Sequence, residues 1–225
     1  MQEGGNMSTK ENNEGYSCKK EKYGGYSSEI FSLVPPKTRV LDIGCSTGAL
    51  AKLLTEKKRC RVIGIDIDEN SLKEASHYCD KVFKCDLDDL EKLNTILKGK
   101  LFDTIALGDI LEHLKYPHLL LKTLKKYLNN DGVVVASIPN AAFISLRIQF
   151  ALGNLSYDKK GGLMDEDHLR FFSFKTAKKL FEEAGYKVKK IYGVSIVRRR
   201  FWFLKSLAKI LPSLFAIHII IKAKK

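Results

Sequence analysis

The stretch VLDIGCSTG, residues 40–48, decides the fold expected for this 225-residue chain. An apolar run at residues 39–43 leads into a glycine-bounded turn, and leucines at helical spacing follow within residues 49–57. The run predicts a buried parallel strand, and the leucines predict a helix directly after the turn. Glycines let the backbone approach a ligand closely, and the helix N-terminus presents free N–H groups. The stretch therefore predicts a ligand-binding loop.

A second predicted strand, residues 61–66, ends at an acidic residue that suits a nucleoside. Asp66 lies 22 residues after Gly44, and an acid at this place can accept hydrogen bonds from both ribose hydroxyls. A dinucleotide loop reads G-x-G-x-x-G, whereas this loop carries Asp42 two residues before its first glycine. An anionic side chain suits a cationic ligand better than a pyrophosphate. The two motifs together predict an adenosine-containing cofactor at the carboxyl ends of the strands.

The rest of the chain alternates between strand-like and helix-like segments. Strands are expected at residues 81–85, 102–108, 133–138, 186–192 and 215–222, and helices at 70–79, 87–97, 117–128, 173–184 and 198–211. Residues 129–132 read as a turn, and residues 140–167 as an irregular segment. Alternation with short connections predicts a parallel sheet with helices on both faces.

On residues 42–48 and Asp66, the chain resembles the class I S-adenosylmethionine-dependent methyltransferases, over about residues 34–194. The resemblance implies a Rossmann-like three-layer α/β sandwich with a seven-stranded, mostly parallel sheet and an antiparallel last strand. It also implies S-adenosylmethionine as cofactor and S-adenosylhomocysteine as product. The loop departs from the commonest family pattern at Ser46, where a glycine is often found.

The resemblance assigns cofactor contacts by position in these motifs. Residues 42–48 would wrap the methionine part, Asp66 would hold the ribose, and Asp86 and Leu87 would flank the adenine. Gly108 and Asp109 would line the site beneath the methionine end. The expected cofactor-binding residues are Asp42, Gly44, Cys45, Ser46, Gly48, Asp66, Ile67, Asp86, Leu87, Gly108 and Asp109.

Two further motifs, DILEHL at residues 109–114 and DHLRFFS at residues 167–173, resemble the branch that contains ubiquinone-biosynthesis O-methyltransferases. In that branch the segment corresponding to residues 139–172 lies over the substrate pocket. The resemblance thus places Asn140 and Arg170 at the substrate.

Two histidines are candidates for the base that a hydroxyl acceptor needs, because histidine accepts protons near neutral pH. His168 is the expected catalytic base, since it lies in the segment over the pocket, and His113 is the second candidate. For each, a structural role in bonding the backbone is the alternative. His77, His118 and His218 lie in no motif.

The formal net charge of +13 is concentrated at one end of the chain. From Ala184 onward there are eleven Lys and Arg and no Asp or Glu, which points to an anionic partner. Residues 198–211 combine aromatic and basic side chains, so this helix could contact an anionic membrane peripherally. Burial of its apolar side against the domain is the favoured alternative.

The remaining expectations concern organisation and compartment. Residues 1–28 read as a flexible arm, with a lid over the cofactor as one interpretation, and residues 29–225 as one methyltransferase domain that ends in a basic helix and a final strand at 198–225. Residues 1–22 lack the apolar core of a signal peptide, so a cytoplasmic protein is expected. Five cysteines without C-x-x-C spacing predict reduced thiols and no metal site. Monomer and homodimer both remain open.

The function expected from these observations is methyl transfer to a small molecule, with a hydroxyl of a sugar, glycolipid or isoprenoid phenol as acceptor. The basic charge leaves nucleic-acid methylation as an alternative. Against it, the chain lacks the Asn/Asp-Pro-Pro-aromatic motif of amino-methylating enzymes and has Ile138-Pro139-Asn140 instead, and no RNA-binding module is recognisable. A cofactor-binding module without catalysis is the third alternative.

Overall fold

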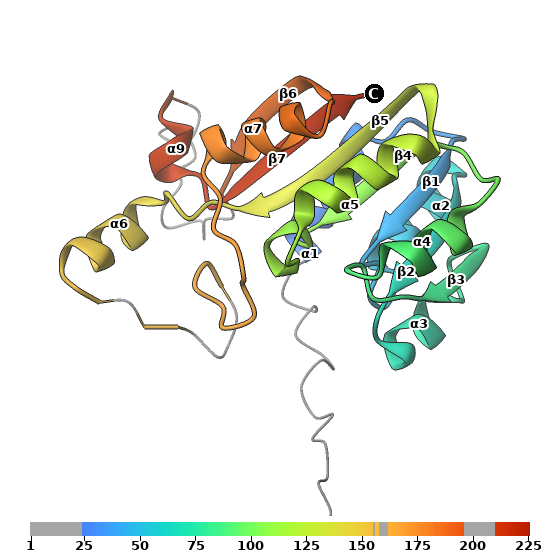
Figure 1. The fold of residues 1–225 in the computed structure, drawn as a ribbon, viewed down its shortest axis with the longest axis horizontal. Helices are drawn as coiled ribbons and strands as arrows, with labels where there is room; N and C mark the ends of the chain where they lie inside the picture. The colour runs from blue at the N-terminus through green and yellow to red at the C-terminus, as the bar shows by residue number, and fades with distance from the viewer. Residues whose placement is uncertain (1–23, 155, 158–161, 196–209) are drawn as a thin grey trace, which may run out of the picture.

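The computed structural model describes residues 24–154, 156–157, 162–195 and 210–225, which build one seven-stranded sheet (Figure 1). The strands are β1 (Arg39–Ile43), β2 (Arg61–Asp66), β3 (Lys81–Lys84), β4 (Phe102–Gly108), β5 (Leu128–Pro139), β6 (Lys187–Val194) and β7 (His218–Lys224). Their order in the sheet is β3-β2-β1-β4-β5-β7-β6. Strands β1 to β5 pair in parallel, and β7 lies antiparallel between β5 and β6. The predicted sheet, with its inserted antiparallel last strand, is confirmed.

Helices cover both faces of this sheet and complete the three layers. They are α1 (Gly24–Leu33), α2 (Ala49–Lys58), α3 (Glu69–Ala75), α4 (Leu90–Leu97), α5 (Pro117–Leu124), α6 (Ile144–Ala151), α7 (Phe174–Glu183) and α9 (Pro212–Phe215), with the short 3-10 helices η2 (Leu111–His113) and η3 (Lys125–Tyr127). Figure 1 shows α4, α5 and α7 on the face turned to the viewer. The core clusters place α1 and α2 on the opposite face.

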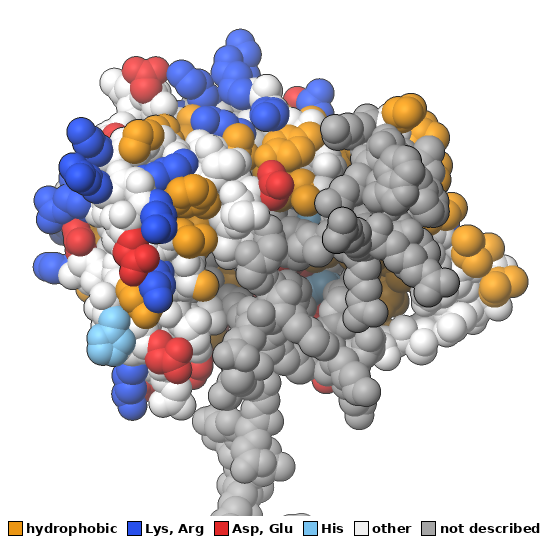
Figure 2. All heavy atoms as spheres, turned by 180° about the vertical axis from the view of Figure 1, so that it is seen from behind, with side chains coloured by type: hydrophobic (Ala, Val, Ile, Leu, Met, Phe, Trp, Pro, Cys, Tyr) orange, Lys and Arg blue, Asp and Glu red, His pale blue; other side chains and the backbone are white. Residues whose placement is uncertain are grey.

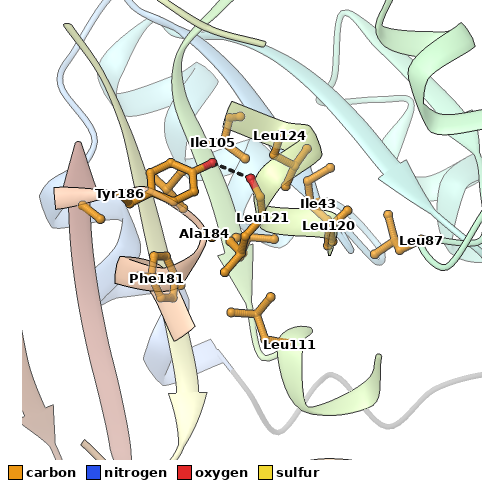
Figure 3. Close-up of a cluster of buried hydrophobic side chains, with 14 of the residues drawn as sticks. Ile43, Leu87, Ile105, Leu111, Leu120, Leu121, Leu124, Phe181, Ala184 and Tyr186 are labelled. Atoms are coloured by element: carbon orange, nitrogen blue, oxygen red, sulfur yellow. Dashed lines mark hydrogen bonds between the residues drawn. The ribbon is translucent and has the colours of Figure 1, made fainter. Parts of the chain in front are cut away.

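Both faces of the central strands are buried because side chains alternate along a strand. In β1, Leu41 and Ile43 join the core beneath α4, α5 and α7, whereas Val40 joins the core beneath α1 and α2. Figure 3 shows the first of these cores, in which the hydroxyl of Tyr186 donates to the carbonyl of Leu121 at 2.8 Å. The apolar run at residues 39–43 therefore forms a strand buried on both faces, as predicted.

The structure corrects the predicted N-terminal boundary. Helix α1 begins at Gly24, inside the stretch expected to be an arm, and its side of the sheet buries Ile30 and Val34 almost completely. Ile30 in this helix and Val34 directly after it pack in the core, so a helix stands where an arm was predicted for residues 24–28. The lid interpretation covers residues 1–28, of which residues 1–23 lie outside the described residues and residues 24–28 lie in α1.

The structure also corrects two segments after β4. Strand β5 starts at Leu128, so the predicted turn at residues 129–132 is part of a strand whose register against β4 shifts between Phe102 and Thr104. The segment expected to be irregular contains helix α6. This helix has few buried side chains, and the weak apolar pattern of its sequence gave no helical signal.

Residues 139–172 form an insert whose two ends meet at the sheet. Asn140 and Phe172 form an isolated parallel bridge, and the amide of Ala141 donates to the carbonyl of Phe172 at 2.8 Å. The insert thus leaves and returns at the carboxyl end of β5. Most of the predicted basic helix at 198–211 lies outside the described residues, and none of the described helices is long and apolar enough to cross a membrane.

Candidate active site

Backbone hydrogen bonds hold the loop after β1 in place, both within the loop and to β2. The amides of Gly44 and Cys45 both donate to the carbonyl of Ile65, at 2.8 and 3.1 Å, and the amide of Gly48 donates to the carbonyl of Cys45 at 2.9 Å. Gly44, Ser46 and Gly48 have positive φ values of 70°, 48° and 80°. Glycine adopts this region without steric cost, whereas a serine pays a penalty there. Ser46 therefore occupies a left-handed position, where a glycine would be free of this penalty.

Asp66 ties this loop to the end of β2. Its Oδ2 accepts a hydrogen bond from the amide of Ser46 at 2.7 Å, and its Oδ1 accepts one from the amide of Asp68 at 3.1 Å. The carboxylate is 8% exposed, and Asp42 on the neighbouring strand is buried as well. These two hydrogen bonds hold the carboxylate between the loop and the end of β2. The structure thus brings together the loop and the acid that the sequence predicted to meet.

Close packing beneath the loop explains two glycines. A Cβ at Gly48 would lie 2.8 Å from the Cα of Ala75, which is a backbone atom of α3 that cannot move aside easily. A Cβ at Gly64 would lie 2.7 Å from the Sγ of Cys45. The loop therefore rests directly on β2 and α3.

The nearby thiol of Cys79 is not a nucleophile. Burial, together with the negative charges of Asp42 and Asp80, raises its pKa to about 12. The thiolate is the reactive form of cysteine, so this side chain is inert near neutral pH.

The ends of β2 and β3 lie side by side and hold the residues expected at the adenine. The amide of Cys85 donates to the carbonyl of Asp66 at 2.9 Å, which joins the two ends. Ile67 is 45% exposed, although it is apolar, and Asp86 is exposed with its Oδ1 accepting from the amide of Asp88 at 2.9 Å. Leu87 is buried. Ile67 and Asp86 are thus available to a ligand, and the contact of Leu87 with the adenine stays a prediction.

Asp109, after β4, contacts Ser137 and His218, two residues that belong to none of the sequence motifs. Its amide donates to the carbonyl of Ser137 at 3.1 Å, and its Oδ1 accepts from the hydroxyl of the same serine at 2.7 Å. The Nε2 of buried His218 lies 3.5 Å from the Oδ2 of Asp109. His218 lies beside Asp109 because β7 pairs with the end of β5, and in this pairing His218 is opposite Pro139. Only the strand order reveals this neighbour.

The two candidate histidines lie against each other. The ring centroids of His113, in η2, and His168, in the insert, are 4.9 Å apart with an interplanar angle of 68°. The carbonyl of Glu112 accepts from the amides of Leu169 and Arg170 at 2.8 and 3.0 Å, which docks the insert on η2. The two motifs that resembled one branch of the family therefore form one contact.

The environment of His168 keeps its imidazole neutral. Burial lowers its pKa below the ordinary value, and the neighbouring His113 lowers it further. Its Nδ1 lies 3.3 Å from the carbonyl of Leu163. A neutral imidazole with one nitrogen bonded to the backbone has a lone pair on the other nitrogen.

The two residues expected at the substrate differ in their present contacts. Asn140 is fully buried, and its amide nitrogen donates to the carbonyls of Ser213 and Ala216 at 3.2 and 2.7 Å, while its Oδ1 accepts from the amide of Ala142. These are structural contacts. Arg170 is exposed and donates to the carbonyl of Lys115 at 2.7 Å. Substrate binding by either residue stays a prediction.

A family model described as a methyltransferase domain matches residues 19–191. The chain belongs to this methyltransferase family. A ubiquinone biosynthesis O-methyltransferase of Glaesserella parasuis is 30% identical over 108 residues, which are 45% of each chain. An (S)-coclaurine N-methyltransferase of Papaver somniferum is 31% identical over 103 residues, 42% of this chain and 28% of the relative. The matches thus span less than half the length of these curated relatives.

Solved structures share the fold of this methyltransferase domain. A SAM-dependent methyltransferase from Archaeoglobus fulgidus matches with a TM-score of 0.65 at 23% identity, over 91% of this chain and 94% of the other. A magnesium protoporphyrin IX methyltransferase from Synechocystis, solved with bound SAH, matches with a TM-score of 0.59 at 16% identity, over 90% of this chain and 83% of the other. At these identities the likeness concerns the fold.

Proposed function

We propose that this chain transfers a methyl group from S-adenosylmethionine to a hydroxyl of a small molecule. The observation that carries the proposal is the carboxylate of Asp66, which accepts a hydrogen bond from the loop at Ser46 while it stands at the carboxyl end of β2. One acidic group thereby orders the loop and stands where it would accept hydrogen bonds from the hydroxyls of a ribose. Family membership supports the reaction type.

In this proposal, the cofactor lies across the carboxyl ends of β1 to β4. Residues 42–48 contact the methionine part, Asp66 binds the ribose, and Ile67, Asp86 and Leu87 flank the adenine. Gly108 and Asp109 line the methionine end. Asp42 and Asp109 add negative charge beneath a ligand that carries a positive sulfonium and ammonium group, which favours its binding.

The chemistry is an in-line displacement. The acceptor oxygen forms a bond to the methyl carbon while the carbon–sulfur bond breaks. The electron pair of the broken bond stays on sulfur, so the leaving group is a neutral thioether. The cofactor supplies the reactivity, and the chain supplies alignment and a pocket shielded from water. The hydroxyl proton must leave, and we assign its removal to the His113–His168 pair, with His168 as the expected base.

Two kinds of observation support the acceptor class: the names of similar proteins and the exposed apolar side chains of α6. A similar protein is named for O-methylation in ubiquinone biosynthesis, and another for N-methylation of an alkaloid. Figure 2 shows hydrophobic side chains at the margin that carries α6, where Ile148, Phe150 and Leu152 are exposed. Exposed apolar surface is typical of contacts with apolar partners. We therefore propose an acceptor with an apolar part, such as an isoprenoid phenol or a glycolipid.

Calorimetric titration of the protein with S-adenosylmethionine and with S-adenosylhomocysteine tests the proposal. The wild type should bind both, and Asp66→Ala should weaken binding about 5- to 150-fold, because hydrogen bonds to a charged acceptor contribute about 1–3 kcal/mol. Asp68→Ala is the matched control, since Asp68 caps α3 and should affect stability without changing affinity. Absence of binding by either ligand at millimolar concentration would overturn the proposal.

Product analysis tests the acceptor class. The enzyme is incubated with S-adenosylmethionine and pairs of acceptors that differ only in a hydroxyl or an amine on the same apolar scaffold. Methylation on oxygen is the expected result. Methylation of the amine partner alone would contradict the hydroxyl assignment while leaving the methyl-transfer reaction in place.

A further inference from the structure

Three side chains that offer metal-ligand atoms meet where η2 packs against the insert. Glu112 and His113 come from η2 and His168 from the insert, and one carboxylate oxygen and one ring nitrogen of each histidine all lie within 4.8 Å of one another. Glu112 is fully buried, and His168 is 7% exposed. Two imidazoles and one carboxylate are a donor set that binds Zn²⁺ and other first-row divalent ions.

The hydrogen bonds of the two imidazoles prepare them for such a role. The Nδ1 of His113 lies 3.0 Å from the carbonyl of Asp167, and the Nδ1 of His168 lies 3.3 Å from the carbonyl of Leu163. A carbonyl only accepts, so each Nδ1 carries the proton and each Nε2 keeps its lone pair. Metal-binding histidines are oriented in this way, with one nitrogen donating to a backbone carbonyl and the other on the ion.

The surrounding charge is negative. Asp109 and Asp165 both interact electrostatically with His168, in addition to the carboxylate of Glu112 beside it. Carboxylates beside the two imidazoles favour the binding of a divalent cation. Edge-on packing of the two rings, the alternative explanation of their contact, does not require both Nδ1 atoms to face carbonyls.

We propose that Glu112, His113 and His168 bind one divalent transition-metal ion, with Zn²⁺ as the best-fitting ion. Zn–N bonds of about 2.0–2.1 Å place tetrahedral ligand atoms about 3.4 Å apart, so the side chains must approach by about 1 Å on binding. Three protein ligands leave a fourth position open, as in catalytic zinc sites. Cysteine spacing predicted no metal site, and this cluster uses no cysteine.

The role of this ion, but not its binding, rests on the proposed function. An ion at this place would withdraw charge from an acceptor oxygen, and the acceptor's proton would then leave more readily to water. His113 and His168 would act as ligands, because the lone pairs that would accept a proton would hold the metal. With the ion bound, water and not His168 would take the acceptor's proton, so the role of base assigned to His168 applies only to the metal-free protein.

Titration of the metal-stripped, untagged full chain with Co²⁺, followed by visible absorption, tests the site, and Zn²⁺ competition confirms it. One Co²⁺ per chain should bind, with ligand-field bands of a four- or five-coordinate site that Zn²⁺ abolishes. Glu112→Gln, His113→Ala and His168→Ala should each weaken binding about 100-fold or more, since even residues that only orient a ligand contribute about 10- to 100-fold. His118→Ala is the matched control, because His118 is exposed and outside the cluster.

Two outcomes would overturn the proposal. One is the absence of Co²⁺ and Zn²⁺ binding by the folded wild type at micromolar concentration. The other is unchanged affinity in all three ligand variants. Because Glu112 is buried and its variant could fail to fold, circular dichroism accompanies each titration, and a rise in Tm with Zn²⁺ is measured for the wild type and the exposed-histidine control.

The same samples separate this proposal from the proposed function. Asp66→Ala should lose affinity for S-adenosylmethionine and keep that for Co²⁺, whereas His168→Ala should show the reverse. If the wild type binds S-adenosylmethionine and no metal, only the metal-site proposal is contradicted. If the wild type binds metal and no S-adenosylmethionine, only the proposed function is contradicted.

Discussion

Different kinds of contact hold together the two sides of the proposed site, which are a cofactor side at residues 42–48 and Asp66 and an acceptor side at His113, His168 and Asn140. On the cofactor side, the loop at residues 42–48 is closed by its own amides and by Asp66, only 20 residues further along the chain than Ser46. On the acceptor side, His113 bonds the carbonyl of Asp167 over 54 residues, and Asn140 bonds that of Ala216 over 76 residues. One side depends on two adjacent strands, and the other on the whole fold.

This difference explains why the sequence predicts the role of the cofactor side better than that of the acceptor side. A binding loop that uses backbone amides depends on glycines and one acid at fixed spacing, and these are visible in a sequence. A cluster of side chains from η2 and the insert has no spacing rule. Gly48→Ala and Asn140→Ala test whether the two sides are also separate energetically, and Tyr186→Phe tests a core contact away from both.

The largest effect is expected at the cofactor loop. Gly48→Ala should lower the free energy of unfolding by about 2–4 kcal/mol, because the new Cβ would meet the backbone of Ala75 and the residue has a positive φ. Affinity for S-adenosylmethionine should fall as well. Urea denaturation and calorimetry measure the two quantities.

Gly99→Ala is the control for that variant. Gly99 also has a positive φ, of 71°, but its Cβ would meet nothing within 4 Å. Its cost should be about 1 kcal/mol, from backbone strain alone, with no change in affinity. Equal costs for the two glycines would show that the packing of the loop on α3 contributes nothing.

An intermediate effect is expected at the base of the insert. Asn140→Ala should lower the free energy of unfolding by about 2–3 kcal/mol, because it leaves the buried carbonyl of Ala216 and the amide of Ala142 without their partner. Affinity for S-adenosylmethionine should stay unchanged in calorimetry. Asn154→Ala, at an exposed asparagine, should change stability by less than about 0.5 kcal/mol. A loss of cofactor affinity in Asn140→Ala would break the separation of the two sides.

The smallest effect is expected at Tyr186, which links the start of β6 to α5. Tyr186→Phe removes a buried hydrogen bond to the carbonyl of Leu121 and should cost about 1 kcal/mol at neutral pH, whereas exposed Tyr116→Phe should cost nothing measurable. Urea denaturation measures both variants.

The pH dependence of that stability has a definite sign. Burial raises the pKa of Tyr186, and burial with Glu29 raises that of Tyr192 to about 12. Above pH about 10 the unfolded phenols lose protons that the folded ones keep, so the unfolded state binds fewer protons and stability falls as the pH rises. The Tyr186→Phe variant should show a shallower alkaline fall than the wild type. An equal slope would contradict the effect of burial on this phenol.

Much of the fold was predictable from local pattern. The strands at residues 39–43, 61–66 and 102–108 were predicted at their observed bounds, because parallel strands buried on both faces are short apolar runs. Helix α1 was missed because its polar, glycine-containing start resembles an arm, although Ile30 and Val34 anchor it. The start of β5 was missed because asparagine, aspartate and glycine predict a turn, and pairing with β4 overrides that preference.

The sequence by itself determined the cofactor loop, because glycines and an acid at fixed spacing act through the backbone of two consecutive strands. Only the tertiary structure decided which side chains meet on the acceptor side: His218 beside Asp109, and Glu112 and His113 beside His168. These contacts depend on where β7 enters the sheet and on where the insert returns. Both are set by the burial of residues far apart in the chain, and no local pattern records them.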